Sequence, residues 1–406
     1  RQQNHTRLFS TPRNNRVRPN FRRFPTEPQT TCLECPLSDP CVTVNANPPE
    51  TCFEIQISMA FTIAHVNVSQ GYRGGERQTE LLIQGLERSN FRQILIARKD
   101  GLLVRHIKSP GLEIRPVSGN RLSIALACKG ADIVHVHEGR SVYGAYLRSL
   151  WAGTPYIVTR RVNNPLGNHW LAHKAYRRAA IVTAVASQVG DVIRQFDSEI
   201  DPHVVYSSAS GFEVDEATSK SIRDTNRGTL LVGHVGALDN NQKGQEFIID
   251  VARQLEKSHP EIQFMLVGDG KDEKTLKAAA ADLRNLTFAG FVENVGDYLA
   301  AFDVFILPSN KEGIGSILLD AMEQSLPIVA SKVGGVPEIV RDGENGILIQ
   351  PACPDQLKAA ILHLSAEPNL RSEMGRRGKL IAASFTSSMM CEKYLNLYRS
   401  VLGTTA

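Results

Sequence analysis

Residues 307–351 read LPSNKEGIGSILLDAMEQSLPIVASKVGGVPEIVRDGENGILIQP and decide the fold of the chain. The stretch starts at the end of an apolar run, 304–307, which predicts a buried strand. The turn Gly313-Ile314-Gly315 follows a polar loop, and Ser316 opens a segment in which apolar residues have helical spacing. A second apolar run at 327–330 predicts the next buried strand. A strand, a glycine-rich turn and a helix in this order indicate a doubly wound α/β domain.

The same turn predicts a binding site for an anion, most often a phosphate. Its glycines let the backbone approach a ligand closely, and the N–H groups that open the helix point at one place. Two carboxylates flank the turn, Glu312 before the helix and Asp320 in its second turn. Asp320 lies about 7.5 Å along the helix axis from Gly315. The two carboxylates can therefore accept hydrogen bonds from different hydroxyls of a nucleotide-linked ligand; the alternative is that both are solvent-exposed.

Length and composition exclude several classes of protein. The chain has 406 residues, which suggests two domains, and its 42% hydrophobic and 22% charged residues are ordinary for a globular protein. The net charge of +4 falls short of the basic surface that nucleic-acid binding needs. No apolar run reaches the roughly 18 residues of a membrane span. We therefore expect neither a nucleic-acid partner nor a transmembrane helix.

The first 58 residues differ from the rest of the chain. They contain Arg but no Lys, show no periodicity and have no apolar core of a signal peptide, so we expect a disordered or spurious N-terminal extension. Met59 would then open the folded protein. Four of the seven cysteines lie in this segment, at Cys32, Cys35, Cys41 and Cys52. They lack a second ligand pair for zinc, and an odd cysteine count without a framework indicates a reducing, cytoplasmic location.

From Met59 onward, apolar runs alternate with helical segments, which predicts parallel sheets covered by helices. A first Rossmann-like domain is expected at 59–210, a polar linker at 211–227 and a second Rossmann-like domain at 228–385. In such domains ligands bind at the carboxyl ends of the strands, so the two domains are expected to share a cleft. The predicted strands are 61–68, 93–97, 112–117, 132–137, 155–159, 181–186 and 203–206, and then 229–236, 263–267, 286–291, 304–307, 327–330 and 346–349.

Glu312, the glycines after it and an acidic residue eight positions on resemble the donor-binding core of retaining glycosyltransferase family 4, the glycosyl transferases group 1. Asp320 stands where that family usually has Glu, and Asp is one methylene shorter. The resemblance runs from Met59 to about Leu402. It implies the GT-B fold, with two Rossmann-like domains facing a cleft and a C-terminal helix, 386–406, that crosses back to complete the first domain.

Lys243 is the cation expected to meet a donor diphosphate. It lies in the segment GALDNNQKG, 236–244, just before a predicted helix. The segment resembles the family's Gly-Arg…Lys-Gly, but Ala237 occupies the position of the Arg, so one of two cations is missing. The alternative for Lys243 is a solvated residue at a helix start.

The first domain offers a glycine-rich loop at its first strand–helix turn. Gly74 and Gly75 stand in GYRGGE, 71–76, which resembles the family's Gly-Gly-x-Glu loop across the cleft from the donor phosphates. The resemblance places Gly75 on the donor side and Gly74 on the acceptor side. The alternative is a tight turn without a binding role.

Two arginines and two histidines end neighbouring strands of the first domain. Arg160 and Arg161, in a Thr-Arg-Arg-Val segment that resembles one subgroup of the family, either replace the missing cation or bind an anionic acceptor; the alternative is a surface ion pair. His135 and His137 point to the same face of their strand, and His137 is an acceptor-side candidate, the alternative being a hydrogen-bonded core residue. No third ligand is visible at suitable spacing, so no metal site is predicted.

Two further segments complete the expected site. Gly268 and Val292 lie where the family binds the nucleotide base, with contacts from the backbone. The stretch 169–178 is basic with interleaved aromatic residues, which indicates either a solvated helix face or peripheral contact with the inner face of a membrane.

The resemblance implies transfer of a hexosyl or pentosyl group from a nucleotide-diphosphate sugar to an acceptor hydroxyl, with retention. A UDP-sugar is favoured over a GDP-sugar, the acceptor is a glycan or a lipid-linked glycan of the cell envelope or lipopolysaccharide, and neither metal nor cofactor is expected. The amides of residues 313–316 and Lys243 would stabilise the diphosphate, Glu312 would hold sugar hydroxyls and Asp320 the ribose. The alternatives are a nucleotide-sugar epimerase of the same fold and an inactive nucleotide-sugar-binding relative, which Ala237 and Asp320 favour.

Overall fold

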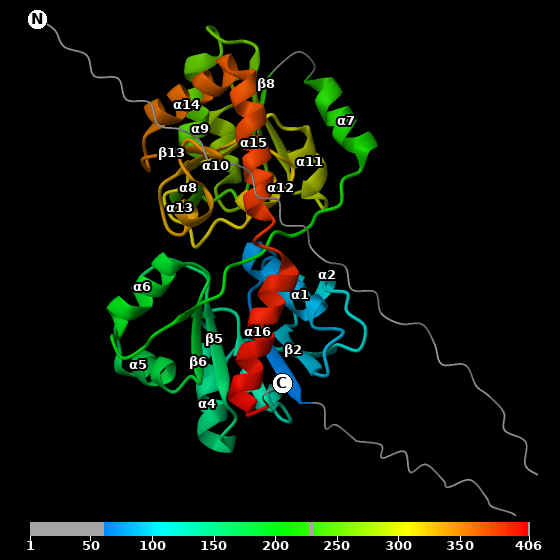
Figure 1. The fold of residues 1–406 in the computed structure, drawn as a ribbon, viewed down its shortest axis with the longest axis vertical. Helices are drawn as coiled ribbons and strands as arrows, with labels where there is room; N and C mark the ends of the chain where they lie inside the picture. Colours follow the sequence, from blue (N-terminus) through cyan, green and yellow to red (C-terminus); the bar gives the residue numbers. More distant parts are fainter. Residues whose placement is uncertain (1–60, 227–229, 405–406) are drawn as a thin grey trace, which may run out of the picture. The chain divides into compact units, whose positions relative to one another are not determined.

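The computed structural model describes residues 61–226 and 230–404 (Figure 1). The predictions made for residues 1–58, including the four cysteines there, and the expected start at Met59 lie outside the described residues. Among the helices that are described, none combines the length and the apolarity needed to cross a membrane.

The first domain is built on a sheet of seven parallel strands in the order β3-β2-β1-β4-β5-β6-β7. The chain order changes direction between β1 and β4, which makes their carboxyl ends the expected place for a ligand. The strands are β1 (Thr62–Asn67), β2 (Arg92–Arg98), β3 (Glu113–Val117), β4 (Ile133–Val136), β5 (Tyr156–Arg160), β6 (Ile181–Ala184) and β7 (His203–Val204). The helices are α1 (Gly74–Gly85), α2 (Leu102–His106), α3 (Arg121–Ala127), α4 (Val142–Ala152), α5 (Trp170–Arg177) and α6 (Ser187–Phe196).

The second domain repeats this architecture with six parallel strands in the order β10-β9-β8-β11-β12-β13. Its strands are β8 (Leu230–Val235), β9 (Ile262–Val267), β10 (Leu286–Gly290), β11 (Val304–Leu307), β12 (Ile328–Ser331) and β13 (Gly346–Ile349). Its helices are α8 (Asn240–Lys243), α9 (Gln245–Leu255), α10 (Glu273–Ala279), α11 (Val295–Ala301), α12 (Ile317–Glu323), α13 (Val336–Ile339), α14 (Pro354–Ala366) and α15 (Pro368–Ala382). The prediction of two doubly wound domains is confirmed.

The C-terminal helix, α16 (Ser387–Leu402), packs on the first domain, beside α1 (Figure 1). Its buried residues Met390, Tyr394 and Tyr398 share one apolar cluster with Leu82 of α1 and Ile63 of β1. The hydroxyl of Tyr398 lies 2.6 Å from His135 Nδ1, so the helix also closes a polar network under the first sheet.

The predicted linker, 211–227, contains a helix, α7 (Glu216–Thr225). Asp215 caps it by accepting from the N–H of Ala217 at 3.2 Å. Its Arg223 binds both carboxylate oxygens of Asp303, at 2.5 and 2.9 Å. Because an ion pair and a cap hold this helix rather than a broad apolar face, hydrophobic periodicity did not reveal it.

Candidate active site

The loop between β11 and α12 offers unused hydrogen-bond donors. Within residues 61–226 and 230–404, no acceptor receives the backbone N–H of any residue in 313–316. Gly315 has a φ of +71°, which lets the chain turn from the strand into the helix. Four consecutive donors without partners in a turn of this kind are suited to an anion, and the binding of one here stays a prediction.

Lys243 and Glu312, the two predicted catalytic residues, are paired. The Lys243 ammonium lies 2.5 Å from Glu312 Oε1, and the Ser309 hydroxyl donates to the same oxygen at 2.8 Å. The side chains are 19% and 8% exposed, so the pair is shielded from most of the solvent. The structure therefore brings a cation and a carboxylate to the loop that carries the unused amides.

The segment around Ala237 packs against the loop that holds Gly268. A Cβ on Gly268 would come within 2.1 Å of the Gly236 carbonyl oxygen, and its φ is +130°, so only glycine fits there. The nearby cation Lys271 is paired with Asp239 at 3.1 Å. Val292, the other residue expected at the nucleotide base, is partly buried against the main core. Ala237 itself supplies no charge.

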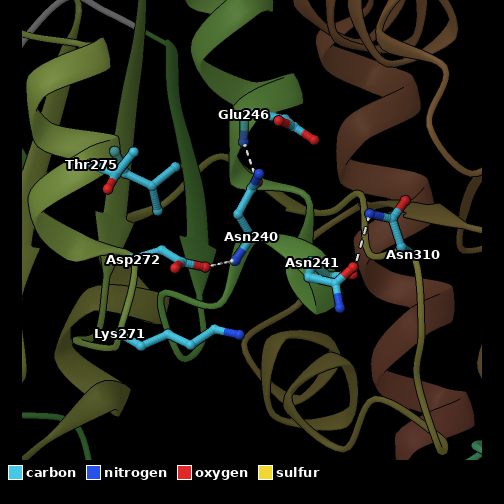
Figure 2. Close-up of a pocket in the computed structure, with 8 residues that line it drawn as sticks. Asn240, Asn241, Glu246, Lys271, Asp272, Thr275 and Asn310 are labelled. Carbon is cyan, nitrogen blue, oxygen red and sulfur yellow. Dashed lines mark hydrogen bonds between the residues drawn. The ribbon is translucent and has the colours of Figure 1, made fainter.

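A polar pocket of about 420 Å³ lies on the outer side of this segment (Figure 2). The N–H of Asn240 donates to Asp272 at 2.8 Å, and Asn310 connects the pocket to the loop after β11. The residues that line it are Asn240, Asn241, Glu246, Lys271, Asp272, Thr275, Leu276 and Asn310. No predicted site residue is among them.

The glycine loop of the first domain contacts the loop between β11 and α12, residues 308–316, which we call the donor loop. A Cβ on Gly74 would lie 3.2 Å from Ser316 Oγ, and one on Gly75 would lie 3.6 Å from Arg161 Cδ. Glu76, at the start of α1, accepts from the N–H of Arg73 at 3.0 Å and so fixes the loop. Residues predicted from separate segments of sequence therefore share one site.

The two neighbouring arginines diverge. Arg160 is 9% exposed and donates from Nη2 to the carbonyl oxygen of Asn164. Arg161 lies instead near His137, with Nη2 3.4 Å from His137 Nδ1. Successive residues of an extended chain point to opposite faces, so Arg160 is turned to Asn164 while Arg161 lies beside Gly75 and His137. A binding role for either guanidinium group stays a prediction.

A third histidine, His65 of β1, joins the two that the sequence singled out. His65 pairs with His135 across the parallel strands, and its Nδ1 lies 3.1 Å from His137 Nε2. The three rings offer ligand atoms that lie within 4.8 Å of one another. The prediction that no third ligand is available was therefore wrong, because strand pairing joins residues about 70 positions apart.

The ring nitrogens of this cluster are engaged in hydrogen bonds. His135 lies between the hydroxyls of Tyr398, at 2.6 Å, and Thr159, at 2.7 Å, while His65 Nε2 lies 3.2 Å from Gln93 Oε1. Burial lowers the pKa of His65 to about 4 and lowers the pKa values of His135 and His137 well below the ordinary value. The histidines are therefore neutral at pH 7 and act as a buried polar network.

Asp320 is hydrogen-bonded to the segment that joins the two domains. Its Oδ1 accepts from the N–H of Ser210 at 2.5 Å and its Oδ2 from the Ser210 hydroxyl at 3.3 Å. Burial raises the pKa of Asp320 to about 7. A buried carboxyl group needs hydrogen-bond donors, and Ser210, in the segment between the domains, supplies them. Contact of Asp320 with a ribose stays a prediction.

Glu338 makes a second contact between the domains that the sequence did not reveal. Its carboxylate accepts from the N–H groups of Ser187, at 2.9 Å, and Gln188, at 3.2 Å, at the start of α6. The Tyr206 hydroxyl donates to it at 2.9 Å. A single Glu in the apolar segment VGGVPEIV, 333–340, carries no signal of such a partner.

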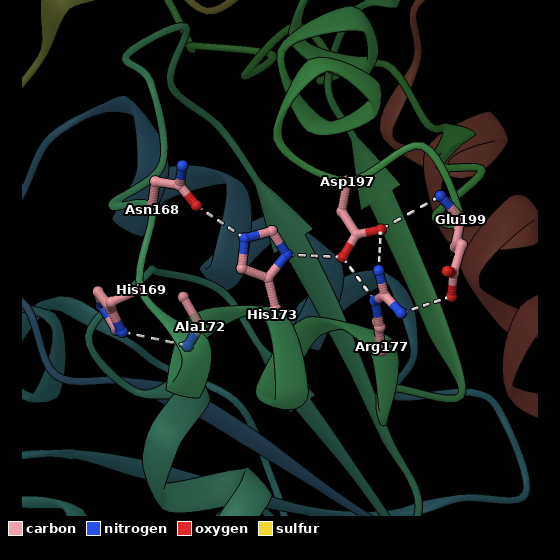
Figure 3. A network of polar contacts seen from close by, with 7 residues as sticks. All are labelled: Asn168, His169, Ala172, His173, Arg177, Asp197 and Glu199. Carbon is pink, nitrogen blue, oxygen red and sulfur yellow. Dashed lines mark hydrogen bonds and ion pairs between the residues drawn. The ribbon is translucent and has the colours of Figure 1, made fainter.

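The basic stretch 169–178 is largely committed to internal contacts (Figure 3). Arg177 pairs with Asp197 at 2.6 Å and with Glu199 at 2.6 Å, and His173 Nδ1 lies 2.7 Å from Asp197. Lys174 lies over the ring of the exposed Trp170. Contact with a membrane surface stays a prediction. Because most charged side chains of this stretch already have partners within the protein, few remain to bind anionic lipids.

Comparison with known proteins identifies similar glycosyltransferases. Residues 229–367 match the family model described as Glycosyl transferases group 1. Alpha-D-kanosaminyltransferase of Streptomyces kanamyceticus is 28% identical over 302 residues, 66% of this chain and 77% of that protein. The lipopolysaccharide core biosynthesis glycosyltransferase LpsE of Rhizobium meliloti is 29% identical over 163 residues, 39% of this chain and 47% of that protein.

Solved structures share the fold. Anabaena Alr3699/HepE, determined in complex with UDP-glucose, superimposes with a TM-score of 0.73 at 20% sequence identity, over 84% of this chain and 99% of that one. The chain is therefore a homologue of glycosyltransferases that has the GT-B fold, and its second domain matches the glycosyl transferases group 1 over residues 229–367.

Proposed function

We propose that the protein is a metal-independent, retaining glycosyltransferase that moves a hexosyl or pentosyl group from a UDP-sugar to an acceptor hydroxyl. The observation that carries the proposal is the loop 312–316, where the paired Glu312 and Lys243 adjoin four unused backbone amides. A leaving diphosphate needs such a set of donors and cations. The complex of Alr3699/HepE with UDP-glucose supports the choice of donor.

The chemistry exchanges one bond at the anomeric carbon of the sugar for another. As the bond from this carbon to the diphosphate oxygen breaks, negative charge grows on the leaving phosphate. The amides of 313–316 and the ammonium of Lys243 stabilise this charge electrostatically. The acceptor oxygen bonds to the same face of the carbon and passes its proton to the leaving phosphate. These protein donors supply positive charge without a metal ion.

Glu312 would orient the sugar. Its carboxylate is held by Lys243 and by the Ser309 hydroxyl, and only its Oε1 takes part in these two contacts. Oε2 can then accept a hydrogen bond from a sugar hydroxyl. A carboxylate fixed at one oxygen by two partners is well placed to position a substrate, because little side-chain entropy is left to lose.

On the acceptor side, Gly74 would adjoin a glycan or a lipid-linked glycan of the cell envelope, and the buried His137 would act through Arg161 without touching the acceptor. The role of the similar protein LpsE in lipopolysaccharide core biosynthesis supports an acceptor of this class. An extended glycan also suits a site between two domains. We propose the cytoplasm, at the inner face of the membrane, as the location where such an acceptor is met.

An inactive nucleotide-sugar-binding relative is the second candidate. It is favoured by Ala237, which lacks the charge of the family's Arg, and by Asp320, which is bound to Ser210. Such a protein would bind the donor and produce neither a glycoside nor an epimer.

The test begins with the full chain and a panel of UDP- and GDP-sugars. A ligand that binds the native state raises the melting temperature, so the panel identifies the nucleotide. The selected donor, with radiolabelled sugar, is then incubated with envelope glycan acceptors. Lys243→Met and Glu312→Gln should abolish transfer, and Lys271→Met, whose cation is paired with Asp239, should not.

Each outcome decides between the candidates. Transfer with retention, read by NMR of the new linkage, supports the proposal. Donor binding without transfer or hydrolysis across the acceptor panel favours the inactive relative. A melting temperature unaffected by every nucleotide would contradict both.

A further inference from the structure

Arg161 has an unusual electrostatic environment. Its Nε is shielded from solvent and has no hydrogen-bond partner, and among the described residues no carboxylate forms an ion pair with its guanidinium. Glu76, an acidic group that acts on Arg161 only electrostatically, accepts from the backbone N–H of Arg73. A shielded cation without a counter-ion is costly unless a ligand supplies the charge.

Among residues 61–226 and 230–404, the one hydrogen-bond partner of the guanidinium is a neutral imidazole, and the orientation of that ring can be worked out. Gln93 Nε2 donates to the carbonyl oxygen of Ile83 at 3.0 Å, so Gln93 Oε1 must accept from His65 Nε2–H. His65 Nδ1 then carries a lone pair and accepts from His137 Nε2–H. His137 Nδ1 is left as an acceptor.

The contact with Arg161, at the other end of this series of hydrogen bonds, requires the same direction of donation. Arg161 can only donate, so His137 Nδ1 must be the acceptor at that end as well. The relay Gln93–His65–His137 therefore has one consistent direction. It orients the guanidinium through a neutral acceptor that does not cancel its positive charge, whereas a carboxylate in place of His137 would neutralise it.

The position of Arg161 shows where that charge is available. Its carbonyl oxygen lies against Gly313 and its Cδ against Gly75, so it adjoins the unused amides of the donor loop. The second domain contributes Lys243 to this place, while Ala237 contributes no charge. The second domain thus contributes only one of the two expected cations, Lys243. Arg161 of the first domain lies beside the same place and has no carboxylate partner among the described residues.

We propose that Arg161 is the second cation of the donor diphosphate site, supplied by the first domain and positioned by the His137–His65–Gln93 relay. The inference rests on the proposed function and adds the source of the missing charge. Since Lys243 and Arg161 belong to different domains, a bound diphosphate connects the two domains directly.

The experiment is calorimetric titration of the full chain with UDP, UMP and uridine at fixed ionic strength. Arg161→Met should weaken UDP binding about 10- to 100-fold, because it removes hydrogen bonds between charged groups, and should leave uridine binding unchanged. Arg160→Met is the matched control, since its guanidinium is bound to Asn164, and should leave UDP binding unchanged. Thermal unfolding of each variant verifies that it folds.

A second pair of variants tests the relay. His137→Asn retains a neutral acceptor, and His137→Asp places a carboxylate beside Arg161. We expect His137→Asp to lose UDP affinity as severely as Arg161→Met, and His137→Asn to retain most of it. A merely structural role of His137 would weaken both variants alike and would overturn the positioning by the relay.

The outcomes separate this inference from the proposed function. If Lys243→Met weakens UDP binding and Arg161→Met does not, the second cation is not Arg161, and the proposed function stands. If Arg161→Met raises only the KM for the acceptor, its anion belongs to the acceptor and the inference is overturned. If UDP and the other nucleotides fail to bind the unmodified chain, the proposed function itself fails.

Discussion

The carbonyl oxygen of Arg161 packs against the Cα of Gly313, so closely that a Cβ on Gly313 would lie 2.0 Å from that oxygen. Arg161 directly follows β5 of the first domain, and Gly313 lies in the loop between β11 and α12 of the second. Their contact sets the distance between the shielded guanidinium and the amides of the donor loop. Glycine at 313 is therefore a requirement of the contact between the domains.

Gly313→Ala should abolish most of the transferase activity and lower the melting temperature only slightly. The new methyl group would push the donor loop away from Arg161, because backbone atoms there have no space to yield, while each domain keeps its own core. Turnover and thermal unfolding are the measurements. Gly139→Ala is the control, since a Cβ there meets nothing within 4 Å. Equal losses of activity in both variants would contradict the steric explanation.

The pair Lys243–Glu312 should be strongly coupled. In a double-mutant cycle with Lys243→Met and Glu312→Gln, followed by urea unfolding, we expect an interaction free energy of about 1–3 kcal/mol. Each single variant leaves the remaining charge shielded from solvent and without its partner. The exposed pair Lys277–Glu273, one helical turn apart, should give about 0.3–0.5 kcal/mol. Similar couplings in the two cycles would show that shielding does not strengthen the pair.

Asp320 should make the protein less stable as the pH rises toward neutrality. Its pKa is raised from 3.8 to about 7 by burial, so the folded protein holds the proton more tightly than the unfolded chain. This stabilisation is complete below the unfolded pKa and is lost between about pH 4 and pH 7. Relative to Asp320→Asn, which does not titrate, the free energy of unfolding should fall by up to about 1.4 kcal/mol per pH unit.

Urea unfolding of both proteins from pH 4.5 to 8 measures this difference. Asp191→Asn, on an exposed face of α6, is the control, and its difference from the unmodified protein should stay constant over that range. A difference between Asp320→Asn and the unmodified protein that does not change from pH 5 to 8 would refute the shift.

The histidine relay should have the opposite dependence. Burial lowers the pKa of His65 from 6.5 to about 4. Between these two pH values the imidazole is protonated in the unfolded chain and neutral in the folded protein. Stability is therefore lost as the pH falls from about 6.5 to about 4. His65→Asn should reduce this slope by one proton, about 1.4 kcal/mol per pH unit at most.

This titration is best followed in the Asp320→Asn background, because Asp320 changes stability in the other direction over the same interval. His363→Asn, an exposed position on α14, serves as the control and should leave the slope as it is. If the two variants have the same slope, His65 is not held neutral by the fold.

The sequence by itself determined the two sheets, their strand positions and the loops that carry Glu312, Lys243 and the glycines. These features are local: apolar runs of strand length, helical spacing and glycine-rich turns are read within a few residues. The helix at 216–225 was missed for the same reason, since a cap and an ion pair to a distant Asp303 hold it in place of an apolar face.

Only the tertiary structure decided which side chains act together. The register of β1 on β4 placed His65 beside His135, and the alternation of side chains along β5 separated Arg160 from Arg161. Asp320 was turned to Ser210, which lies 110 positions away in the chain. Contacts of this kind depend on strand register, side-chain direction and the contact between the domains, and none of these has a local pattern in the sequence.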